Sequence, residues 1–587
     1  MNKASSCIFT LLLTLLPLML AGQTRLSIAE GPEPHLRAMD EAFQRGELTA
    51  DQHLLQKFLL ATTPERVMEP FREGADKVRF RCLTPLLMEY EARKEELQPE
   101  TQNEIEALAE NVCSRPDTDF THTSESGRFR FYYSLEGPHA VPSHEYVEEA
   151  AFAADSSWNQ QIGRLGFADP VTAPQLTPYE IYFKDFLPYG VTCSLGLTSY
   201  IILNNSYEEG FPPNEHPQGN QIGALFVSVA HELKHASQYE TNPSAFGDSW
   251  FDWIEMDAVM MEEEVFDDVN DYYHYIKSDG LSGSTPSGSS IFGNPEAPTP
   301  GAYEHATWML YFAETIGMEF WVNVWERIGR SQSLPFLEAI RRELTSISED
   351  FGEHHIRNIT WHQASGPGYA TDSFGFEERD SYPNPAFSQD GTIQLVPDTL
   401  AVRPTLQPLA ARFYRVQPSN DPSGQVRIRI DQTQPETGIG LTAYFRDGSS
   451  DFEYRPGDGT QTELLTEWRW RELRELGIAI VNYSSESPST YQLRIEQVSP
   501  EELTLSQNYP NPFYPTTRIR FGVERPGQVR LEIYDLMGRR VQTLENSHVE
   551  AGFHEVRFDG RGLASGVYFY QIVSGGESRA RKMLLVR

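Results

Sequence analysis

The chain has 587 residues with 84 acidic and 48 basic side chains, which give a formal net charge of −36. At about 100–200 residues per domain, this length predicts three to five domains. Hydrophobic residues make up 39% of the chain, which suffices for packed cores and excludes a wholly disordered protein. Because so acidic a surface repels phosphate groups, nucleic acid and anionic membrane surfaces are not expected partners.

The N-terminus has the features of a secretory signal peptide. Lys3 precedes an apolar run at 8–20, and the small residues Ala21 and Gly22 follow it. A helix of this length covers about 20 Å, which is shorter than the bilayer core of about 30 Å. We therefore expect residues 1–22 to be removed and the mature chain to carry no transmembrane segment. An uncleaved anchor is the alternative.

Removal of the signal, which contains Cys7, would leave Cys82, Cys113 and Cys193. An oxidising compartment favours disulfides, and three thiols allow three pairings. A Cys82–Cys113 bond that closes a helical hairpin is one of them, and it would leave Cys193 as a buried free thiol. The sequence leaves the choice open.

The patterns in chain order predict a multidomain α+β protein. Residues 23–125 are predicted to be a helical N-terminal region, in which the polar stretch 117–127 is a linker. Mixed helix and strand patterns follow at 126–388. Short alternating runs at 389–499 predict an antiparallel β-sandwich. A small Ig-like all-β domain is predicted at 503–587, and residues 501–587 are also distinct in charge, with 12 basic and 10 acidic side chains.

The mixed region has clear local signals. Its predicted elements are strands at 128–133, 179–183 and 199–203, a helix capped by Ser143, a strongly apolar helix at 221–240, a Gly/Ser/Pro-rich loop at 278–301, and a helix at 303–314 that stops before Gly317.

The helix predicted at 221–240 carries the sequence His231-Glu232-Leu-Lys-His235. Histidines at i and i+4 lie on one helix face about one turn apart, so both imidazoles can reach one metal ion. Glu232 lies beside them, where a carboxylate can take a proton from metal-bound water. A helix with two solvated histidines is the alternative.

Glu255 is the predicted third ligand, 20 residues after His235. Its apolar neighbours Trp253 and Ile254 favour a buried carboxylate, whereas the alternative is one more surface carboxylate. Two histidines and one glutamate leave a fourth coordination position open, which is typical of catalytic zinc sites.

The motif and the order of elements resemble the gluzincin metallopeptidases, which have the zincin fold. The segments 230–238 and 253–258 are similar to the HEFFHA-Q … W-x-E-x-x-A arrangement of secreted bacterial metallopeptidases. The metzincin class is excluded because positions 238 and 241 lack its Gly and His. The resemblance implies Zn²⁺ bound by His231, His235 and Glu255, with Glu232 as general base and acid. The sequence departs from the usual pattern at Leu233, Lys234, Met256 and Asp257.

The resemblance also implies how a substrate would bind. The strand at 199–203 would line the cleft and pair with an extended peptide by strand addition. A donor to the developing oxyanion is expected. Tyr303 is our first choice and His274 a weaker one, while aromatic packing is the alternative role for Tyr303. His305 follows at the head of the same predicted helix.

The C-terminal unit resembles a type IX secretion sorting domain. The resemblance is carried by Asn508–Phe513, Tyr534–Val541, Gly566–Tyr570 and Lys582–Arg587. It implies passage through the periplasm and outer membrane by the type IX machinery, to a secreted or cell-surface location. An ordinary Ig-like binding module is the alternative.

Two functions follow as hypotheses. The first is a secreted zinc metalloendopeptidase that hydrolyses peptide bonds of extracellular proteins. The second is a non-catalytic cell-surface binding or adhesion protein on a zincin scaffold. Residues 23–125 could also be a propiece that blocks the cleft, with Cys113 as a thiol that caps the metal. The acidic clusters at 262–264 and 267–271 could bind calcium, but solvated helix ends are commoner, so no site is assigned.

Overall fold

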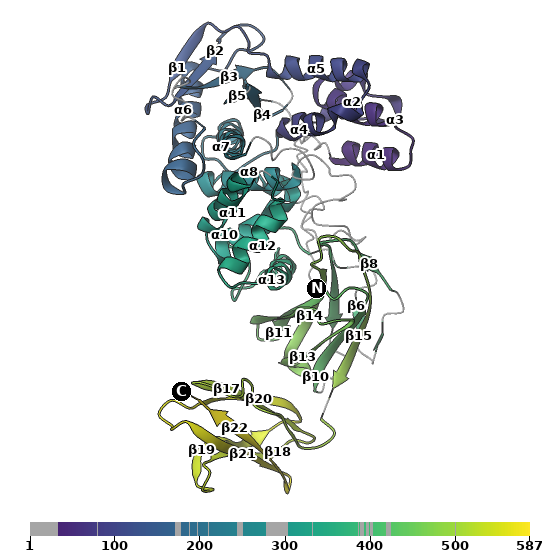
Figure 1. The fold of residues 1–587 in the computed structure, drawn as a ribbon, viewed down its shortest axis with the longest axis vertical. Coiled ribbons are helices and arrows are strands. Elements are labelled where there is room, and N and C mark those ends of the chain that lie inside the picture. The colour runs from purple at the N-terminus through teal and green to yellow at the C-terminus, as the bar shows by residue number, and fades with distance from the viewer. Residues whose placement is uncertain are drawn as a thin grey trace, which may run out of the picture.

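In the computed structural model, the described residues are 33–586 apart from gaps at 79, 171–177, 187, 196–197, 209–210, 243–250, 277–302, 332, 386, 388–391, 395–397, 400–402, 418–423 and 499. The predicted signal peptide at 1–22 and the predicted loop at 278–301 lie outside these residues. The described chain is a mixed helical and multi-sheet β protein that ends in a β domain (Figure 1).

The N-terminal region is helical, as the apolar spacing predicted. Its elements are α1 (Glu33–Gln44), α2 (Ala50–Thr62), η1 (Pro64–Arg66), α3 (Glu69–Arg72), η2 (Ala75–Lys77), α4 (Thr84–Arg93), η3 (Lys94–Glu96) and α5 (Pro99–Cys113). Thr49 begins α2 through a capping box with Gln52. Lys57 of α2 contacts Asp40 of α1 at 2.9 Å and Glu89 of α4 at 3.3 Å. This buried ion-pair network joins three of the helices.

A five-stranded sheet follows, in the spatial order β1-β2-β3-β5-β4. Its strands are β1 (Phe120–Thr123), β2 (Phe129–Tyr133), β3 (Tyr179–Lys184), β4 (Gly190–Leu195) and β5 (Thr198–Asn204). The central strands β2, β3 and β5 are parallel, whereas the edge strands β1 and β4 pair antiparallel with their neighbours. The three predicted strands are confirmed.

The linker prediction for residues 117–127 is wrong in part, because β1 lies within it. The strand is largely exposed at the sheet edge, so it has no apolar alternation that could signal it. Its ladder to β2 and the stacking of Phe120 on Tyr133 hold it in place.

Helices cover both faces of this sheet. On one face lie α6 (His144–Trp158), which is followed by the π-helical turn η4 (Asn159–Arg164), and α7 (Asn220–Thr241). Ser143 caps α6 as predicted, because its hydroxyl accepts the N–H of Tyr146. The N-terminal helices bury Tyr182, Val191 and Ile202 on the opposite face.

The end of α5 is docked on the sheet by polar contacts. Lys184 of β3 donates its ammonium protons to the carbonyl oxygens of Val112 and Ser114, both at 3.2 Å. A cation at this position complements the carbonyl end of the helix dipole. Tyr200 of β5 also donates its hydroxyl to the carbonyl of Cys113.

A helical layer packs beneath the sheet region. It consists of α8 (Phe251–Phe266), α9 (Tyr273–Ile276), η6 (Tyr303–His305), α10 (Ala306–Thr315), α11 (Glu319–Arg330), α12 (Phe336–Ser346) and α13 (Phe351–Gln363). The predicted helix at 303–314 therefore begins as a 3₁₀ turn and continues as α10. The largest core of the described chain lies here, around Trp308 and Trp321.

Two sheets form the predicted β-sandwich, with their core between them. Their strands are β6 (Thr392–Gln394), β7 (Asp398–Thr399), β8 (Thr405–Leu406), β9 (Ala411–Gln417), β10 (Gln425–Gln432), β11 (Thr437–Phe445), β12 (Ser450–Arg455), β13 (Gln461–Arg469), β14 (Leu473–Asn482) and β15 (Ser489–Val498), with the turn η7 (Trp470–Glu472). Among the described pairings of these sandwich strands, β6–β9 is parallel and the others are antiparallel. Gly440 lets α13 lie directly on β11, because a Cβ there would meet Thr360 Oγ1 at 2.2 Å.

The last unit is also built from two sheets, in the orders β16-β17-β20 and β19-β18-β21-β22. Its strands are β16 (Thr504–Leu505), β17 (Thr516–Val523), β18 (Gly527–Tyr534), β19 (Arg540–Val549), β20 (Gly552–Asp559), β21 (Gly566–Ser574) and β22 (Glu577–Leu585). It occupies the end of the molecule opposite the N-terminal helices (Figure 1).

Candidate metal centre

Helix α7 places the two motif histidines in the interior of the protein. Its residues from Gly223 to Gln238 are buried, so the helix is held rigidly between the sheet and α8. His231 and His235 lie one turn apart with their Nε2 atoms 3.0 Å from each other. The predicted helix and the predicted meeting of the two imidazoles are confirmed.

Helix α8 brings Glu255 to the same point. Its Oε2 lies 3.1 Å from His231 Nε2, and its Oε1 lies 3.0 Å from His235 Nε2. Glu255 is fully buried. The interpretation of this residue as one more surface carboxylate is therefore wrong.

The outer nitrogens of the two imidazoles have acceptor partners. His231 Nδ1 lies 2.6 Å from the Glu262 carboxylate, and His235 Nδ1 lies 2.8 Å from Gln238 Oε1. The Gln238 amide is fixed in this orientation because its Nε2 donates to the carbonyl of Ile254. Both Nδ1 atoms must therefore donate, so the Nε2 atoms face Glu255 and are the ones available to bind a metal ion.

This donor set fits a metal ion. Ligand atoms about 2.0–2.1 Å from a tetrahedral zinc are about 3.3 Å apart, close to the separations of 3.0–3.1 Å seen here. The buried carboxylate also needs a positive charge beside it, which a metal ion can supply in place of a proton on His235. Burial opposes ionisation of Glu255, but the two imidazoles outweigh it and hold its pKa well below its usual range.

The two imidazoles titrate differently. Burial lowers the pKa of His231 to about 4, so this side chain is neutral at pH 7. Burial acts the same way on His235, but the Glu255 carboxylate outweighs it and raises the pKa of His235 to about 9. The metal-free cluster thus holds a proton that a bound cation would displace.

Glu232 lies beside this cluster and is fixed by β4. Thr192 donates its hydroxyl to Glu232 Oε2 at 2.7 Å and to the Glu232 carbonyl at 2.9 Å. Gly190 lets the strand pass this close, since a Cβ there would meet Glu232 Cγ at 2.7 Å. Burial raises the pKa of Glu232 to about 7. A carboxyl group with such a pKa can accept and return a proton near neutral pH.

Two of the four departures of this sequence from the resembled pattern contact each other. Lys234 and Asp257 form a buried ion pair at 3.2 Å. Asp257 also accepts hydrogen bonds of 2.8 Å from Gln238 and Trp325. Asp257 therefore reaches His235 through Gln238, and Lys234 balances its charge.

Tyr303 lies next to the cluster. Its hydroxyl accepts the backbone N–H of Cys82 at 3.1 Å, and its ring centre is 6.2 Å from that of His231. Burial, followed by the charge of Glu255, raises the pKa of Tyr303 well above its usual range. His274 and His305 do not belong to the group of residues that converge here. His305 is buried, and its pKa is lowered to about 3 by that burial.

Cys82 is the cluster residue that sequence analysis missed. The ligand atoms of Cys82, His231, His235 and Glu255 all lie within 4.8 Å of one another. Cys82 precedes α4 by two residues and meets α7 only through the tertiary fold. No local pattern could have indicated this contact.

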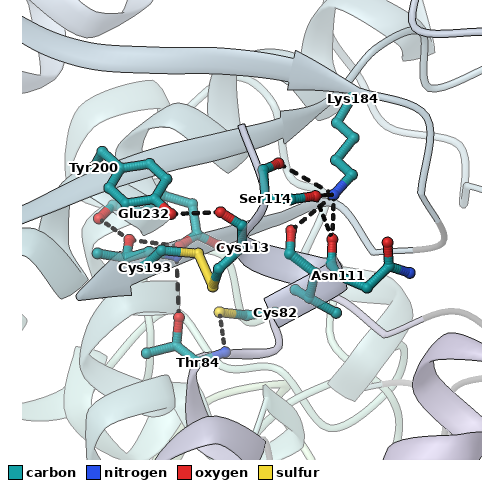
Figure 2. The surroundings of a disulfide bond; sticks show 11 residues. Cys82, Thr84, Asn111, Cys113, Ser114, Lys184, Cys193, Tyr200 and Glu232 are labelled. Atoms are coloured by element: carbon teal, nitrogen blue, oxygen red, sulfur yellow. Dashed lines mark hydrogen bonds between the residues drawn. A yellow bond between two sulfur atoms is a disulfide. The ribbon is translucent and has the colours of Figure 1, made fainter. Parts of the chain in front are cut away.

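The disulfide joins Cys113 to Cys193, so the Cys82–Cys113 pairing is wrong. Cys113 ends α5 and Cys193 lies on β4, and their Cα atoms are 5.8 Å apart. Cys82 is a buried free thiol instead, and its sulfur accepts the Thr84 N–H at 3.3 Å (Figure 2). Because Cys113 is bonded to another cysteine, it is not the thiol that caps a metal.

The strand beside the centre also differs from the prediction. The strand at 199–203 corresponds to β5, which lies between β3 and β4 and has no free edge. The edge strand is β4. The prediction that 199–203 would pair with an extended peptide is therefore wrong, and Gly190 and Thr192 of β4 are the positions that adjoin Glu232.

The acidic segments after Glu255 are not free calcium loops. Glu262 and Asp271 are buried and both pair with the Arg81 guanidinium. Glu263 and Asp267 form an acidic group with Glu378, and no further feature of the described residues around it indicates a bound cation.

Comparisons with known proteins concern mainly the C-terminus. Residues 507–586 match the family described as the secretion system C-terminal sorting domain. This module is a type IX secretion sorting domain. It implies interaction with the type IX machinery and export to the cell surface or extracellular space. Within the described residues, every helix is too short or too polar to cross a bilayer.

No curated protein matches the chain. Among solved structures, it is similar to dimeric latent PorU from Porphyromonas gingivalis, with 17% identity, a TM-score of 0.14 and coverage of 29% of this chain and 19% of that one. A β-glucuronidase from Faecalibacterium prausnitzii has 8% identity, a TM-score of 0.12 and coverage of 30% and 36%. The chain spans well under two thirds of both proteins, and likenesses of this extent carry no argument about its fold or function.

Proposed function

We propose that the chain is a secreted zinc metallopeptidase with a zincin-type catalytic region. His231, His235 and Glu255 would hold the metal. The observation that carries the proposal is the convergence of two imidazole Nε2 atoms and a buried carboxylate at 3.0–3.1 Å. When bound there, zinc supplies a Lewis acid that polarises a carbonyl group and lowers the pKa of water.

Glu232 is the proposed general base and acid. It would take a proton from the attacking water and give it to the leaving amine of the peptide. Thr192 holds one carboxylate oxygen by a hydrogen bond of 2.7 Å, which orients the other towards the cluster. The Tyr303 hydroxyl, in the same buried space, would donate to the developing oxyanion.

The substrate class follows from β4 and from the sorting domain. An extended peptide could add to the outer edge of β4 through the N–H groups of Gly190 and Thr192, which brings its backbone beside Glu232. Export implies that the peptide bonds would belong to extracellular proteins.

The test compares casein hydrolysis and zinc content in the wild type and in Glu232→Gln. Both assays are repeated in a Cys82→Ser background, because the Cys82 sulfur lies within 4.8 Å of the ligand atoms of the three proposed ligands. This substitution leaves those three ligands intact. We expect Glu232→Gln to keep its zinc and to lose at least about a hundredfold in hydrolysis, as general-base removal does. Undiminished hydrolysis by Glu232→Gln would refute its role. Bound zinc without turnover in either background would favour the binding-protein hypothesis.

A further inference from the structure

We infer that Cys82 is a fourth protein ligand of the metal and that residues 80–84 hold the proposed peptidase closed. The inference rests on the proposed function for the identity of the metal site. Cys82 is 3% exposed and lies with His231, His235 and Glu255 in the group whose ligand atoms are within 4.8 Å of one another. Two imidazoles, a carboxylate and a thiolate complete a tetrahedron, so the position needed for substrate would be filled.

The sulfur is held by the backbone around it. The Cys82 N–H donates to the Tyr303 hydroxyl at 3.1 Å. The Thr84 N–H donates to Cys82 Sγ at 3.3 Å, as Figure 2 shows. Hydrogen bonds donated to a ligand sulfur stabilise the thiolate form and fix its direction. The sulfur thus accepts one backbone hydrogen bond, and the Cys82 backbone is anchored by Tyr303, in contrast to a cysteine that fills a gap in an apolar core.

Residues 80–84 also cover the edge of β4. The N–H of Tyr189 donates to the Phe80 and Arg81 carbonyls at 3.2 and 3.1 Å, and that of Gly190 to the Arg81 carbonyl at 3.2 Å. Cys82 and Gly190 form a parallel β-bridge. The Thr192 N–H donates to Thr84 Oγ1 at 3.2 Å. The N–H groups that an added substrate strand would use are thus already bonded to this segment.

The neighbouring residue Arg81 fixes the segment from the other side of His231. Its Nε donates to Glu262 at 3.1 Å, and its Nη1 lies 2.9 Å from Asp271. Glu262 is the carboxylate that orients His231. Arg81 therefore reaches His231 through Glu262, and Cys82 lies at the metal-facing side of the same imidazole.

The fold indicates how such a closed form would open. The N-terminal helices cover an apolar face of the sheet, and the Cys113–Cys193 disulfide keeps α5 bonded to β4. Loss of the whole region would expose that face, so displacement of residues 80–84 alone is the smaller change. The bond between Sγ and the metal would break, the sulfur would take up a proton from solvent, and water would enter the vacated position.

Cobalt(II) substitution tests the inference through the spectrum of the metal. A thiolate ligand gives an intense ligand-to-cobalt charge-transfer band in the near ultraviolet, which nitrogen and oxygen ligands do not give. We expect the band in the wild type and its loss in Cys82→Ser, with about one cobalt per chain in both. The matched control is the Cys113→Ser/Cys193→Ser variant, which should keep the band.

Hydrolysis gives a second readout. Cys82→Ser should hydrolyse casein at least about tenfold faster than the full-length wild type, because the fourth position is then open. Bound cobalt without the band in the wild type would overturn the inference and leave the three-ligand site intact. No bound metal in the wild type or in Cys82→Ser would overturn the proposed metal site and, with it, the role of Cys82.

Discussion

The Lys234–Asp257 pair allows a quantitative test of how the centre is supported. Both side chains are at most 1% exposed and their charged atoms are 3.2 Å apart. At an effective dielectric constant of about 20, their Coulomb attraction is about 5 kcal/mol. Removal of one partner leaves the other charge buried, which typically costs about 3–5 kcal/mol.

We expect Lys234→Met to destabilise the α7–α8 unit by about 3 kcal/mol. This loss is at the lower end of the range of about 3–5 kcal/mol, because the Asp257 carboxylate still accepts hydrogen bonds from Gln238 and Trp325. Asp257→Asn should cost a similar amount, since the ammonium group then faces the rings of Phe167 and Trp325, whose centres are 3.2 and 5.4 Å away, without a carboxylate partner at position 257. The double variant should lose at least about 2 kcal/mol less than the sum of the two single losses.

Hydrogen exchange of amides in α7 and α8 is the suitable assay. It measures the local opening free energy, whereas global unfolding of a chain with several cores is not a two-state process. A control pair on the surface is Arg342 and Glu338 of α12, where the same cycle should give a coupling below about 0.5 kcal/mol. Strictly additive losses for Lys234 and Asp257 would refute the reasoning.

Three further predictions concern other parts of the described chain. Gly190→Ala should reduce hydrolysis at least about tenfold while zinc remains bound, because the new Cβ would lie only 2.7 Å from Glu232 Cγ and push that side chain aside. Unchanged hydrolysis at full zinc content would contradict this prediction. Burial lowers the pKa of His355 to about 3, so as the pH falls below about 6.5 this histidine gains a proton in the unfolded chain and not in the folded one, and stability falls. His355→Gln should therefore remove about 2 kcal/mol of the stability loss between pH 7.5 and 5, measured by hydrogen exchange in α13. An unchanged pH dependence in the variant would count against this role of His355. Cys113→Ser should destabilise the attachment of α5 to β4 by about 2–5 kcal/mol, because the disulfide closes a loop with a sequence separation of 80. Hydrogen exchange of the α5 amides measures this loss. Full protection of α5 in the variant would contradict the Cys113–Cys193 pairing.

Local patterns predicted much of the fold because their signals lie within a few residues. The apolar helix at 221–240, the Ser143 cap and the alternating strands of the two β units depend on neighbouring side chains. The same holds for His231 and His235, whose spacing in one helix fixes their meeting. Glu255 was found because one apolar helix carries a carboxylate at the right distance.

The rest depends on contacts between distant segments. Cys82 reaches the histidines only because residues 80–84 lie along β4, and that edge was not predicted. The pairing of Cys113 with Cys193 likewise requires α5 to end beside β4, across a sequence separation of 80. Glu262 was predicted as part of a solvated acidic cluster, although Arg81 and His231 bury it.

The central claim is that His231, His235 and Glu255 hold one metal ion together. The most direct test is the zinc content of the purified mature chain, its Glu255→Ala variant and a Glu264→Ala control. Glu264 lies on the same helix and accepts a hydrogen bond from Gln160 at 2.6 Å. We expect about one zinc per chain in the wild type and control, and loss of zinc in Glu255→Ala. Equal zinc in all three proteins would contradict the account.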